Sequence, residues 1–439
     1  LFLESLEKLD LKYIDTDILS PSYIFENIIK GANKRISQKY SLDEDAELSQ
    51  QAIDLVTQEF IKQEGKPIFY KNAYQLLKEK NLGIELFDLI SEGLLGTFIK
   101  NEIKYVFFTY QKLENYFISK FILNKYVHFQ DDQPTEETIK FLTKIITDYQ
   151  HPWNNRMILE SISTLVAETY KHELIEILDP YKNDEIIQTT FMRSLLWRNK
   201  NSFTDITNKY IDELLKTDKN NYFELLGTLL KLSTIPNHPL NAYRLHKHLL
   251  SQKIPHRDAN WGEFLINSNE YKSIERIINW NWFQSTNYKI EDEIIILNGI
   301  VLCWMCSSSN NEVRDKATKA LVSIFTNKCT LFLSLLKMFK DIDDPYILER
   351  IYAVGYGIAL REINAKNLID LANYIYELEF KNNTPYPNIL LRDYARGIVE
   401  LSKIQIQKQE IEPPYISDIN FDVHISEYSD SNVGVQPDT

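Results

Sequence analysis

The apolar side chains along most of this chain follow the spacing of amphipathic helices. They recur three or four positions apart, which is the period of one helical face. Before residue 130, the ranges with this spacing are 22–38, 47–63, 72–80, 84–91 and 111–127. From residue 136 to about residue 252, one helical pattern follows another with short polar breaks between them. The pattern predicts a mainly α-helical protein.

One short region interrupts the helical spacing. Residues 95–100 and 103–109 are rich in β-branched and aromatic side chains, and the polar pair Asn101 and Glu102 separates them. Such a pattern predicts a β-hairpin. Because three helices precede it, the order is that of a winged-helix domain, which we place at residues 46–130.

Many winged helices read DNA by inserting their third helix into the major groove. Here the third helix carries Glu85, Asp88 and Glu92 and has no Lys or Arg. Phosphates would repel this surface. A packing or regulatory winged helix is therefore favoured over a DNA reader, and an unrelated helix and hairpin is the remaining alternative.

A repeat marks the last third of the chain. The motif Arg-x-x-Ala begins at Arg314, Arg350 and Arg392, in steps of 36 and 42 residues, each time early in an apolar helical run. A period near 40 with two helices per unit is typical of HEAT-like repeats. The alternative is coincidence in a helix-rich chain.

These patterns together predict a fold class and a domain order. The fold is mainly α, with a winged-helix domain and its small β-hairpin followed by an α-solenoid of HEAT-like helical repeats. The remaining segments are expected to be an N-terminal helical connector at 1–45, a helical array at 131–290, HEAT-like repeats at 291–410, and an extended strand and polar tail at 411–439. Because the chain begins with Leu1, we expect it to be a piece of a longer protein.

Glycine is scarce, and this excludes several classes of nucleotide-binding enzyme. The 439 residues include 12 glycines, where ordinary usage would give about 30. Phosphate-binding loops need glycines at fixed offsets. The one Gly-x-Gly, at Gly355 and Gly357, lies in a helical pattern, and no glycine pair leads into Lys-Ser or Lys-Thr. We expect no catalysis and no cofactor in this segment.

The charge balance and the hydropathy pattern limit the classes of partner that this chain is expected to bind. Lys and Arg number 49 and Asp and Glu 62, giving a formal net charge of −13, which disfavours a nucleic-acid partner. The longest nearly unbroken apolar run, residues 294–306, is too short for a membrane span of about 20 residues. Three cysteines are too few for a disulfide scaffold. We expect a cytoplasmic protein without nucleic-acid or membrane binding.

Two clusters have the residue types of metal ligands. Cys303 and Cys306 have the spacing of a zinc half-site or a redox pair, but their apolar surroundings favour buried structural thiols. Four of the eight histidines lie close together, at 238, 246, 248 and 256. His246 and His248 are two apart and point to different helix faces, so a solvated basic surface is favoured over a metal site.

A polar stretch between two predicted helices contains Arg257, Asp258 and Trp261. It is either a ligand-contacting loop or, more commonly for such residues, an Arg–Asp pair beside a Trp that packs on the scaffold. The chain has no nucleophile elbow, HExxH or EF-hand motif. The sequence therefore identifies neither catalytic residues nor a metal site.

Residues 105–117 resemble the end of the winged-helix domain of STAND NTPases, in which a hydrophobic strand leads into a helix. The residues that carry this resemblance are Phe108, Thr109, Tyr110, Glu114, Tyr116 and Phe117. Downstream, the segments 255–261, 344–350, 391–396 and 413–415 are similar to parts of bacterial antiviral (AVAST-type) STAND/NACHT proteins. They contribute Arg257, Asp258, Trp261, Arg350, Arg392 and Asp393, and Arg314 shares their repeat motif. The resemblance covers about residues 46 to 415.

The resemblance implies a function. This chain would follow a NACHT-type ATPase core and would be a regulatory and sensor segment that recognises a phage protein and controls ATP-dependent oligomerisation and effector activation. Its implied partners are a phage protein, its own ATPase core and further copies of itself, and ATP and magnesium are expected for the full-length parent. Family winged helices often offer a His to the nucleotide, but no histidine precedes His128, so no such contact is carried over.

Two other hypotheses remain open. The first is a non-enzymatic α-solenoid scaffold for protein–protein interaction, without any NTPase. The second is an enzyme built on a helical solenoid, which would need a convergent polar pocket lined by residues such as His246 and Arg257.

Overall fold

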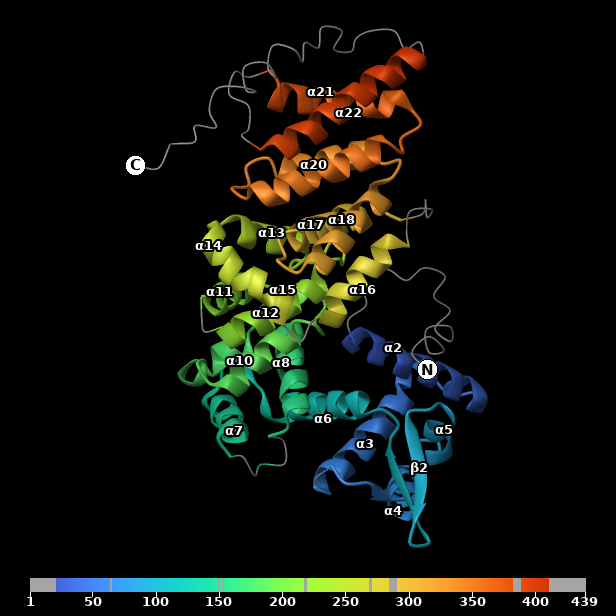
Figure 1. The fold of residues 1–439 in the computed structure, drawn as a ribbon. Helices are drawn as coiled ribbons and strands as arrows, with labels where there is room; N and C mark the ends of the chain where they lie inside the picture. The colour runs from blue at the N-terminus through green and yellow to red at the C-terminus, as the bar shows by residue number, and fades with distance from the viewer. Residues whose placement is uncertain are drawn as a thin grey trace. The chain divides into compact units, whose positions relative to one another are not determined.

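The computed structural model describes residues 21–63, 65–148, 151, 154–216, 219–267, 271–283, 290–381 and 388–409. The protein is mainly helical (Figure 1), as predicted. The chain divides into two compact units, Leu1–Thr228 and Leu229–Thr439. The strand and tail predicted after residue 410 lie outside the described residues, as do residues 1–20.

The first unit begins with helices and a small sheet. The helices are α2 (Pro21–Tyr40), η2 (Glu44–Ala46), α3 (Leu48–Lys62), α4 (Tyr70–Lys80) and α5 (Leu86–Ser91). The hairpin strands are β2 (Leu95–Lys100) and β3 (Ile103–Phe108), so the three helices and the hairpin are confirmed as elements. A third strand, β1 (Ile68–Phe69), was not anticipated, and it pairs antiparallel with β3 to give the order β1-β3-β2.

The hairpin turn explains why two residues suffice to reverse the chain. Asn101 and Glu102 both have positive φ, 50° and 66°. Two consecutive residues with positive φ match the right-handed twist of the flanking strands. The turn fixes the register in which Lys100 faces Ile103 and Phe98 faces Tyr105.

Helix α2 is bonded to the elements that follow it. The Asn33 amide donates to the Glu44 carbonyl over 2.8 Å and accepts from the Ser49 N–H over 3.1 Å. The Lys39 ammonium lies 2.7 Å from the carboxylate of Asp88 in α5, whose side chain is 1% exposed. Helix α2 therefore packs as part of the same region as α3 and α5.

The remainder of the first unit is a run of short helices. They are α6 (Gln111–Tyr126), α7 (Glu136–Thr147), α8 (Arg156–Tyr170), α9 (Leu174–Ile177), η3 (Asp179–Tyr181), α10 (Glu185–Ser194), η4 (Lys200–Ser202) and α11 (Asp205–Leu214), and α12 (Lys219–Leu232) crosses into the second unit. Between α6 and α7, β4 (Phe129–Gln130) pairs with β5 (Gln133–Pro134). Thr135, Asn155, Asp184 and Thr204 cap helices with side-chain oxygens, which satisfy the first free backbone N–H groups.

The second unit continues the helical pattern. Its elements are α13 (Ala242–Leu250), α14 (Ile254–Arg257), the π-helix η5 (Asp258–Gly262), α15 (Glu263–Asn267), α16 (Tyr271–Trp282), α17 (Asp292–Met305), α18 (Asn311–Phe325), α19 (Cys329–Met338), α20 (Pro345–Ala359), α21 (Ala365–Glu379) and α22 (Ile389–Lys408). The apolar run at 294–306 lies in α17 and its C-cap, where Ile295 to Cys306 are all buried. Of the described helices, none combines the length and apolar character that a membrane crossing requires.

Helices α17 to α22 stack in two rows, which Figure 1 shows for α18, α20 and α22. Between α18 and α20, Asp315 forms an ion pair with Arg350 and the Val322 side chain packs against Gly357. The two residues of each pair are 35 positions apart in the sequence. Glu349 bonds to Asn388 and Tyr356 meets Gly397, 39 and 41 residues apart. Since both members of each pair advance together along their helices, neighbouring helices of the row run parallel. The offsets match the 36- and 42-residue steps of the sequence repeat.

The second row, α17, α19 and α21, has the same parallel register. Gly299 of α17 meets Leu335 of α19, 36 residues on. The Lys337 ammonium of α19 lies 5.3 Å from the centre of the Tyr374 ring of α21, 37 residues on. Successive helices from α17 to α22 therefore alternate between the two rows.

Glycines allow neighbouring helices of this region to approach closely, both between the rows and within one row. A Cβ on Gly299 would lie 2.7 Å from the Phe325 ring, and one on Gly397 would lie 2.6 Å from the Tyr356 ring. Both distances are below van der Waals contact, so only glycine fits at these helix crossings. These glycines therefore allow close packing between neighbouring helices.

Candidate functional site

Of the six residues that carry the sequence resemblance at the junction of β3 and α6, Phe108, Tyr116 and Phe117 are buried in the core. Phe108 is 3% exposed, and its ring centre lies 5.0 Å from that of Phe60 and 5.8 Å from that of Phe117. The Thr109 N–H donates to the Leu94 carbonyl over 3.2 Å. Tyr110 is the N-cap of α6 and makes no side-chain capping bond. These residues fix the direction in which α6 leaves the sheet.

Helix α6 also carries a half-buried carboxyl, that of Glu114, and a buried phenol, that of Tyr116. Burial raises the pKa of the Glu114 carboxyl. The Tyr116 hydroxyl donates to the Glu26 carboxylate over 3.1 Å, and burial raises its pKa as well. The Tyr116 ring lies 5.4 Å from that of Phe25. Tyr116 thus ties α6 to α2.

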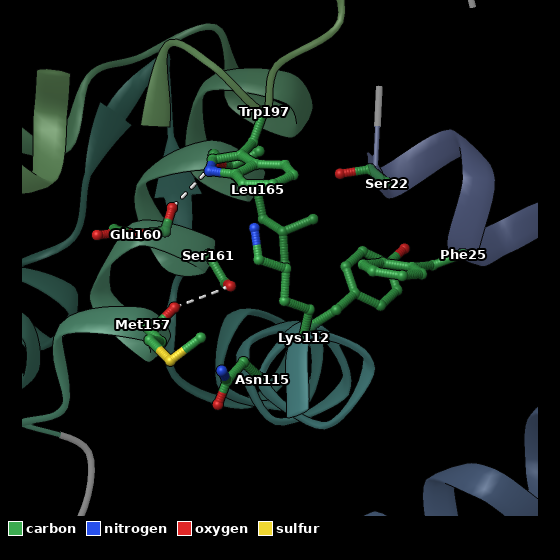
Figure 2. A pocket seen from close by; sticks show the side chains of 11 residues that line it. Ser22, Phe25, Lys112, Asn115, Met157, Glu160, Ser161, Leu165 and Trp197 are labelled. Atoms are coloured by element: carbon green, nitrogen blue, oxygen red, sulfur yellow. Dashed lines mark hydrogen bonds between the residues drawn. The ribbon is translucent and has the colours of Figure 1, made fainter. Parts of the chain in front are cut away.

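A cavity of about 50 Å³ lies beside Tyr116. Figure 2 shows the Lys112 side chain rising from α6 towards Trp197, with Phe25 to one side and Asn115 at its foot. The Lys112 ammonium lies 2.8 Å from the centre of the Trp197 ring, a cation–π contact. The other lining residues are Ser22, Tyr116, Met157, Glu160, Ser161, Thr164 and Leu165.

The electrostatics of this cavity favour small polar occupants. Burial lowers the pKa of Lys112, while the nearby negative charge of Glu160 partly opposes the shift. Asn115 is 4% exposed, and its amide nitrogen has no hydrogen-bond partner among the described residues. A cavity of this size holds only a few water molecules.

The outer face of the three-stranded sheet is apolar. We call Phe69, Phe98, Ile103, Tyr105 and Phe107 the aromatic face. Phe69 and Phe98 both stand opposite Tyr105 in the strand register, and the Tyr105 ring lies 5.1 Å from the first and 5.2 Å from the second. Phe69, Phe98 and Ile103 are 41, 37 and 44% exposed.

The inner face of the same sheet is buried and forms part of the core of the first unit. Val106 and Phe108 alternate with Tyr105 and Phe107 along β3 and are 0 and 3% exposed. A one-sided antiparallel sheet normally has polar residues on its solvent side. The aromatic face departs from that rule, and an exposed apolar patch on a folded domain marks an interaction site.

Arg257, Asp258 and Trp261 lie in the second unit and are helical. Arg257 ends α14 and the other two belong to the π-helix η5, so the loop, the less favoured of the two interpretations, does not form. Arg257 pairs with Asp343, with 2.6 Å between guanidinium and carboxylate, and lies 3.6 Å from Asp344. Asp258 is exposed, and the partial burial of its carboxyl raises its pKa.

A buried hydrogen-bond chain runs next to Arg257. The Trp261 indole N–H donates to the Trp304 carbonyl over 2.8 Å, and the Trp304 indole N–H donates to His246 Nδ1 over 3.0 Å. Arg257 lies 5.3 Å from the Trp304 ring centre and is 1% exposed. The Trp packing predicted for this stretch is confirmed, and the whole cluster joins α13, α14, η5 and α17.

The histidines were predicted to form a solvated basic surface, and this is wrong for two of them. His238 and His246 are 9 and 8% exposed, and burial lowers the pKa of both, that of His238 to about 4. The Leu240 N–H donates to His238 Nδ1 over 3.0 Å, which requires that nitrogen to be unprotonated. Both rings are therefore neutral packing groups near neutral pH.

Two of the repeat arginines join neighbouring helices. Arg314 and Arg350 lie 5.1 and 5.6 Å from the centre of the same Tyr346 ring. The Arg350 guanidinium also lies 3.4 Å from the carboxylate of Asp315 in α18. Arg392 is half-buried, and its charge acts on Glu379 of α21.

Asp393 follows Arg392 in α22 and is exposed. The three cysteines are buried free thiols. Burial raises the pKa of Cys303 well above its usual value and that of Cys306 to about 11. The structural assignment for Cys303 and Cys306 is thus confirmed. Within the described residues, no cluster of His, Cys, Asp or Glu has a metal-binding arrangement.

Comparison with protein-family models, with curated proteins and with solved structures gave no match to this chain. Its function is therefore argued from its own residues. Sequence reasoning missed the aromatic face, although a signal was present. Phe98 and Ile99 are adjacent, as are Val106, Phe107 and Phe108. Continuous apolar runs in a two-stranded hairpin indicate that both faces are apolar.

Proposed function

We propose that this chain is a regulatory and sensor segment of an antiviral STAND NTPase and acts by binding protein. The observation that carries the proposal is the register of α17 to α22. Pairs such as Val322 with Gly357 and Tyr356 with Gly397 repeat at the period of the arginine motif. A parallel two-row stack with that period supports the HEAT-like assignment.

The order of elements in the first unit supports the regulatory part of the proposal. Helices α3, α4 and α5 followed by β2 and β3 fit a winged-helix domain, and α2 and α6 pack against it. In the resembling family, such a domain precedes a helical sensor. The partners that we propose on this basis are a phage protein, an ATPase core and further copies of the chain, with ATP and magnesium bound by a longer parent.

Stacked helical repeats are suited to this role. Each repeat contacts mainly its neighbours, so the array presents an extended surface that large partners bind. The polar residues that sequence analysis singled out in the repeats, Arg314 and Arg350, hold neighbouring helices together around Tyr346. They support a rigid binding scaffold and provide no chemistry of their own.

The test is co-expression of residues 1–439 with the individual proteins of a phage, followed by affinity capture and size-exclusion chromatography. The proposal predicts that one phage protein co-elutes with the chain at a fixed stoichiometry and does not co-purify with an unrelated helical protein. If every phage protein of a set that triggers the parent fails to bind, the sensor assignment is wrong.

The alternative is a helical scaffold that joins cellular proteins without an NTPase. The aromatic face favours it equally, since such a face suits any protein partner. The residues encoded upstream of Leu1 distinguish the two functions. A Gly-x-x-x-x-Gly-Lys-Ser/Thr motif between a strand and a helix is required by the sensor proposal and not by the scaffold. His246 and Arg257 are bonded within a buried cluster, which gives the enzyme hypothesis no support.

A further inference from the structure

The cavity beside Trp197 is lined by two hydrogen-bond donors that have no acceptor. The Asn115 side chain is 4% exposed, and within the described part of the chain its amide nitrogen has no partner. No described carboxylate forms an ion pair with the Lys112 ammonium, which contacts the Trp197 ring instead. A buried donor without an acceptor costs free energy, so a ligand that accepts hydrogen bonds is stabilised here.

The two donors belong to one face of α6. Lys112 and Asn115 are three positions apart, a spacing that makes side chains neighbours on a helix surface. Both line the cavity, and Figure 2 shows Asn115 at the foot of the Lys112 side chain. A single small group with two acceptor atoms can therefore take a hydrogen bond from each of them.

The carboxylate that lines the cavity has cations of its own. The Glu160 carboxylate lies 3.4 Å from the Arg156 guanidinium and 3.5 Å from that of Arg193. These two charges balance that of Glu160 and reduce the repulsion that it exerts on an anion in the cavity. Lys112 is left with a positive charge that no described side chain pairs.

Two further carboxyls, Glu26 and Glu168, act electrostatically on Tyr116, but neither of them lines the cavity. Glu26 accepts the hydrogen bond of the Tyr116 hydroxyl. The Glu168 carboxyl accepts from the Asn199 N–H over 2.7 Å, and burial raises its pKa. Burial thus disfavours the negative charge of Glu168, and both carboxyls are bonded within the protein.

The size of the cavity limits the ligand. One water needs about 10–15 Å³ of such space, so a cavity of about 50 Å³ accommodates roughly four non-hydrogen atoms. A carboxylate with one methyl group is of this size. The apolar side chains of Phe25 and Leu165 also line the cavity, which suits the methyl group.

We propose that this cavity binds the carboxylate of a small organic acid of the size of acetate. One carboxylate oxygen accepts from the Lys112 ammonium and the other from the Asn115 amide. Lys112 is exposed, so a ligand reaches its ammonium from solvent. The carboxylate belongs either to a free acid or to the C-terminus of a peptide. The site is independent of the proposed function.

A neutral amide is the competing occupant. The Ser161 and Thr164 hydroxyls donate to carbonyls of their own helix, so their oxygens can still accept from the N–H groups of an amide ligand. The unpaired charge of Lys112 favours the carboxylate, because hydrogen bonds between two charged groups are about twice as strong as neutral ones.

The experiment is saturation-transfer difference NMR on the full chain, with acetate, acetamide and N-acetylglycine titrated at constant ionic strength. We expect saturable binding of acetate and at least tenfold weaker binding of acetamide, which has the same shape without the charge. N-acetylglycine identifies the source of the carboxylate. Weaker binding than that of acetate indicates a free acid, and equal or tighter binding indicates a peptide C-terminus.

Amine acylation followed by peptide mass spectrometry locates the bound acetate on the unaltered chain. Partial burial lowers the pKa of Lys112, and a bound anion both raises it and covers the amine. Acetate should therefore slow the acylation of Lys112 several-fold. Lys125 is the internal control, because it lies on the same helix and is exposed, and its acylation should not change.

Two variants separate the donors. Lys112→Met should weaken acetate binding at least tenfold, whereas Lys125→Met, the matched control, should leave it unchanged. Asn115→Leu should weaken binding several-fold. Because this change removes a donor that has no partner, it should preserve the fold and keeps the test decisive if Lys112→Met fails to fold.

Three results would overturn the proposal. Absence of saturable acetate binding would mean that the cavity holds water only. Acetamide binding as tight as that of acetate would make it a site for neutral polar groups. Unchanged acetate affinity in folded Lys112→Met and Asn115→Leu variants would place the acetate elsewhere on the chain.

Discussion

Replacing Arg198 with methionine should destabilise the first unit strongly. The Arg198 guanidinium donates two hydrogen bonds, of 2.6 and 2.7 Å, to the Glu173 carboxylate. The two side chains are 0 and 1% exposed. Thr207 donates to the same carboxylate over 2.5 Å, and Ser194 bonds to the guanidinium. The pair joins the start of α9 to the chain that follows α10.

The magnitude follows from what the substitution leaves behind. Arg198→Met keeps the apolar volume but leaves the Glu173 charge buried with one side-chain donor, Thr207. Removing one partner of a buried ion pair costs about 3–5 kcal/mol. Removing both charges, in Arg198→Met with Glu173→Leu, leaves no buried charge and should cost much less than the two single changes added together.

The assay is urea unfolding followed by far-UV circular dichroism, fitted with separate transitions for the two units. The Arg198→Met change should move one transition only. Arg156→Met is the matched control. The Arg156 side chain is 47% exposed and lies 3.4 Å from Glu160, so its loss should cost under about 1 kcal/mol. A loss below 1 kcal/mol for Arg198→Met, or full additivity in the double variant, would refute this reasoning.

Two further predictions concern the second unit. Burial lowers the pKa of His238 to about 4, whereas an unfolded His titrates near 6.5. Between these two pKa values the unfolded chain therefore binds more protons than the folded chain. The free energy of unfolding consequently falls as the pH is lowered through this range. His238→Asn, which keeps an acceptor for the Leu240 N–H, should recover about 2 kcal/mol of that loss near pH 4.5, and identical pH profiles by urea unfolding would contradict this. Gly299→Ala should destabilise by about 1–3 kcal/mol, because its Cβ meets the buried Phe325 ring at 2.7 Å. Gly31→Ala, whose Cβ would meet only the exposed Arg35 side chain, should be neutral or stabilising by up to about 1 kcal/mol. Equal thermal unfolding midpoints for the two glycine variants would contradict the packing account.

Local patterns made much of the fold predictable. The hairpin could be located because Asn101 and Glu102 separate two β-rich runs, and its structure places both residues at positive φ. The repeat could be located because Arg314, Arg350 and Arg392 recur at a period set by helix pairs. The strand β1 could not be found, since two residues are too few to show an alternating pattern.

The features that could not be predicted depend on contacts between residues far apart in the sequence. Arg257 has an acidic neighbour in Asp258, yet its ion-pair partner is Asp343, 86 residues away. No local pattern carries that information. His238 and His246 look like surface groups because histidine is polar, but both are buried, and His246 packs against Trp304 and Phe339, which are far from it in the sequence. For the same reason, the cavity beside Lys112 and Trp197 could not be seen along the chain.

The central claim is that this chain recognises a protein with the stacked helices α17 to α22. Hydrogen–deuterium exchange of residues 1–439, alone and with a phage protein captured by co-expression, tests it most directly. The account predicts slower exchange in at least one row of that stack when the phage protein is bound. A bound phage protein that leaves exchange in α17 to α22 unchanged, or the failure of any phage protein to bind, would contradict it.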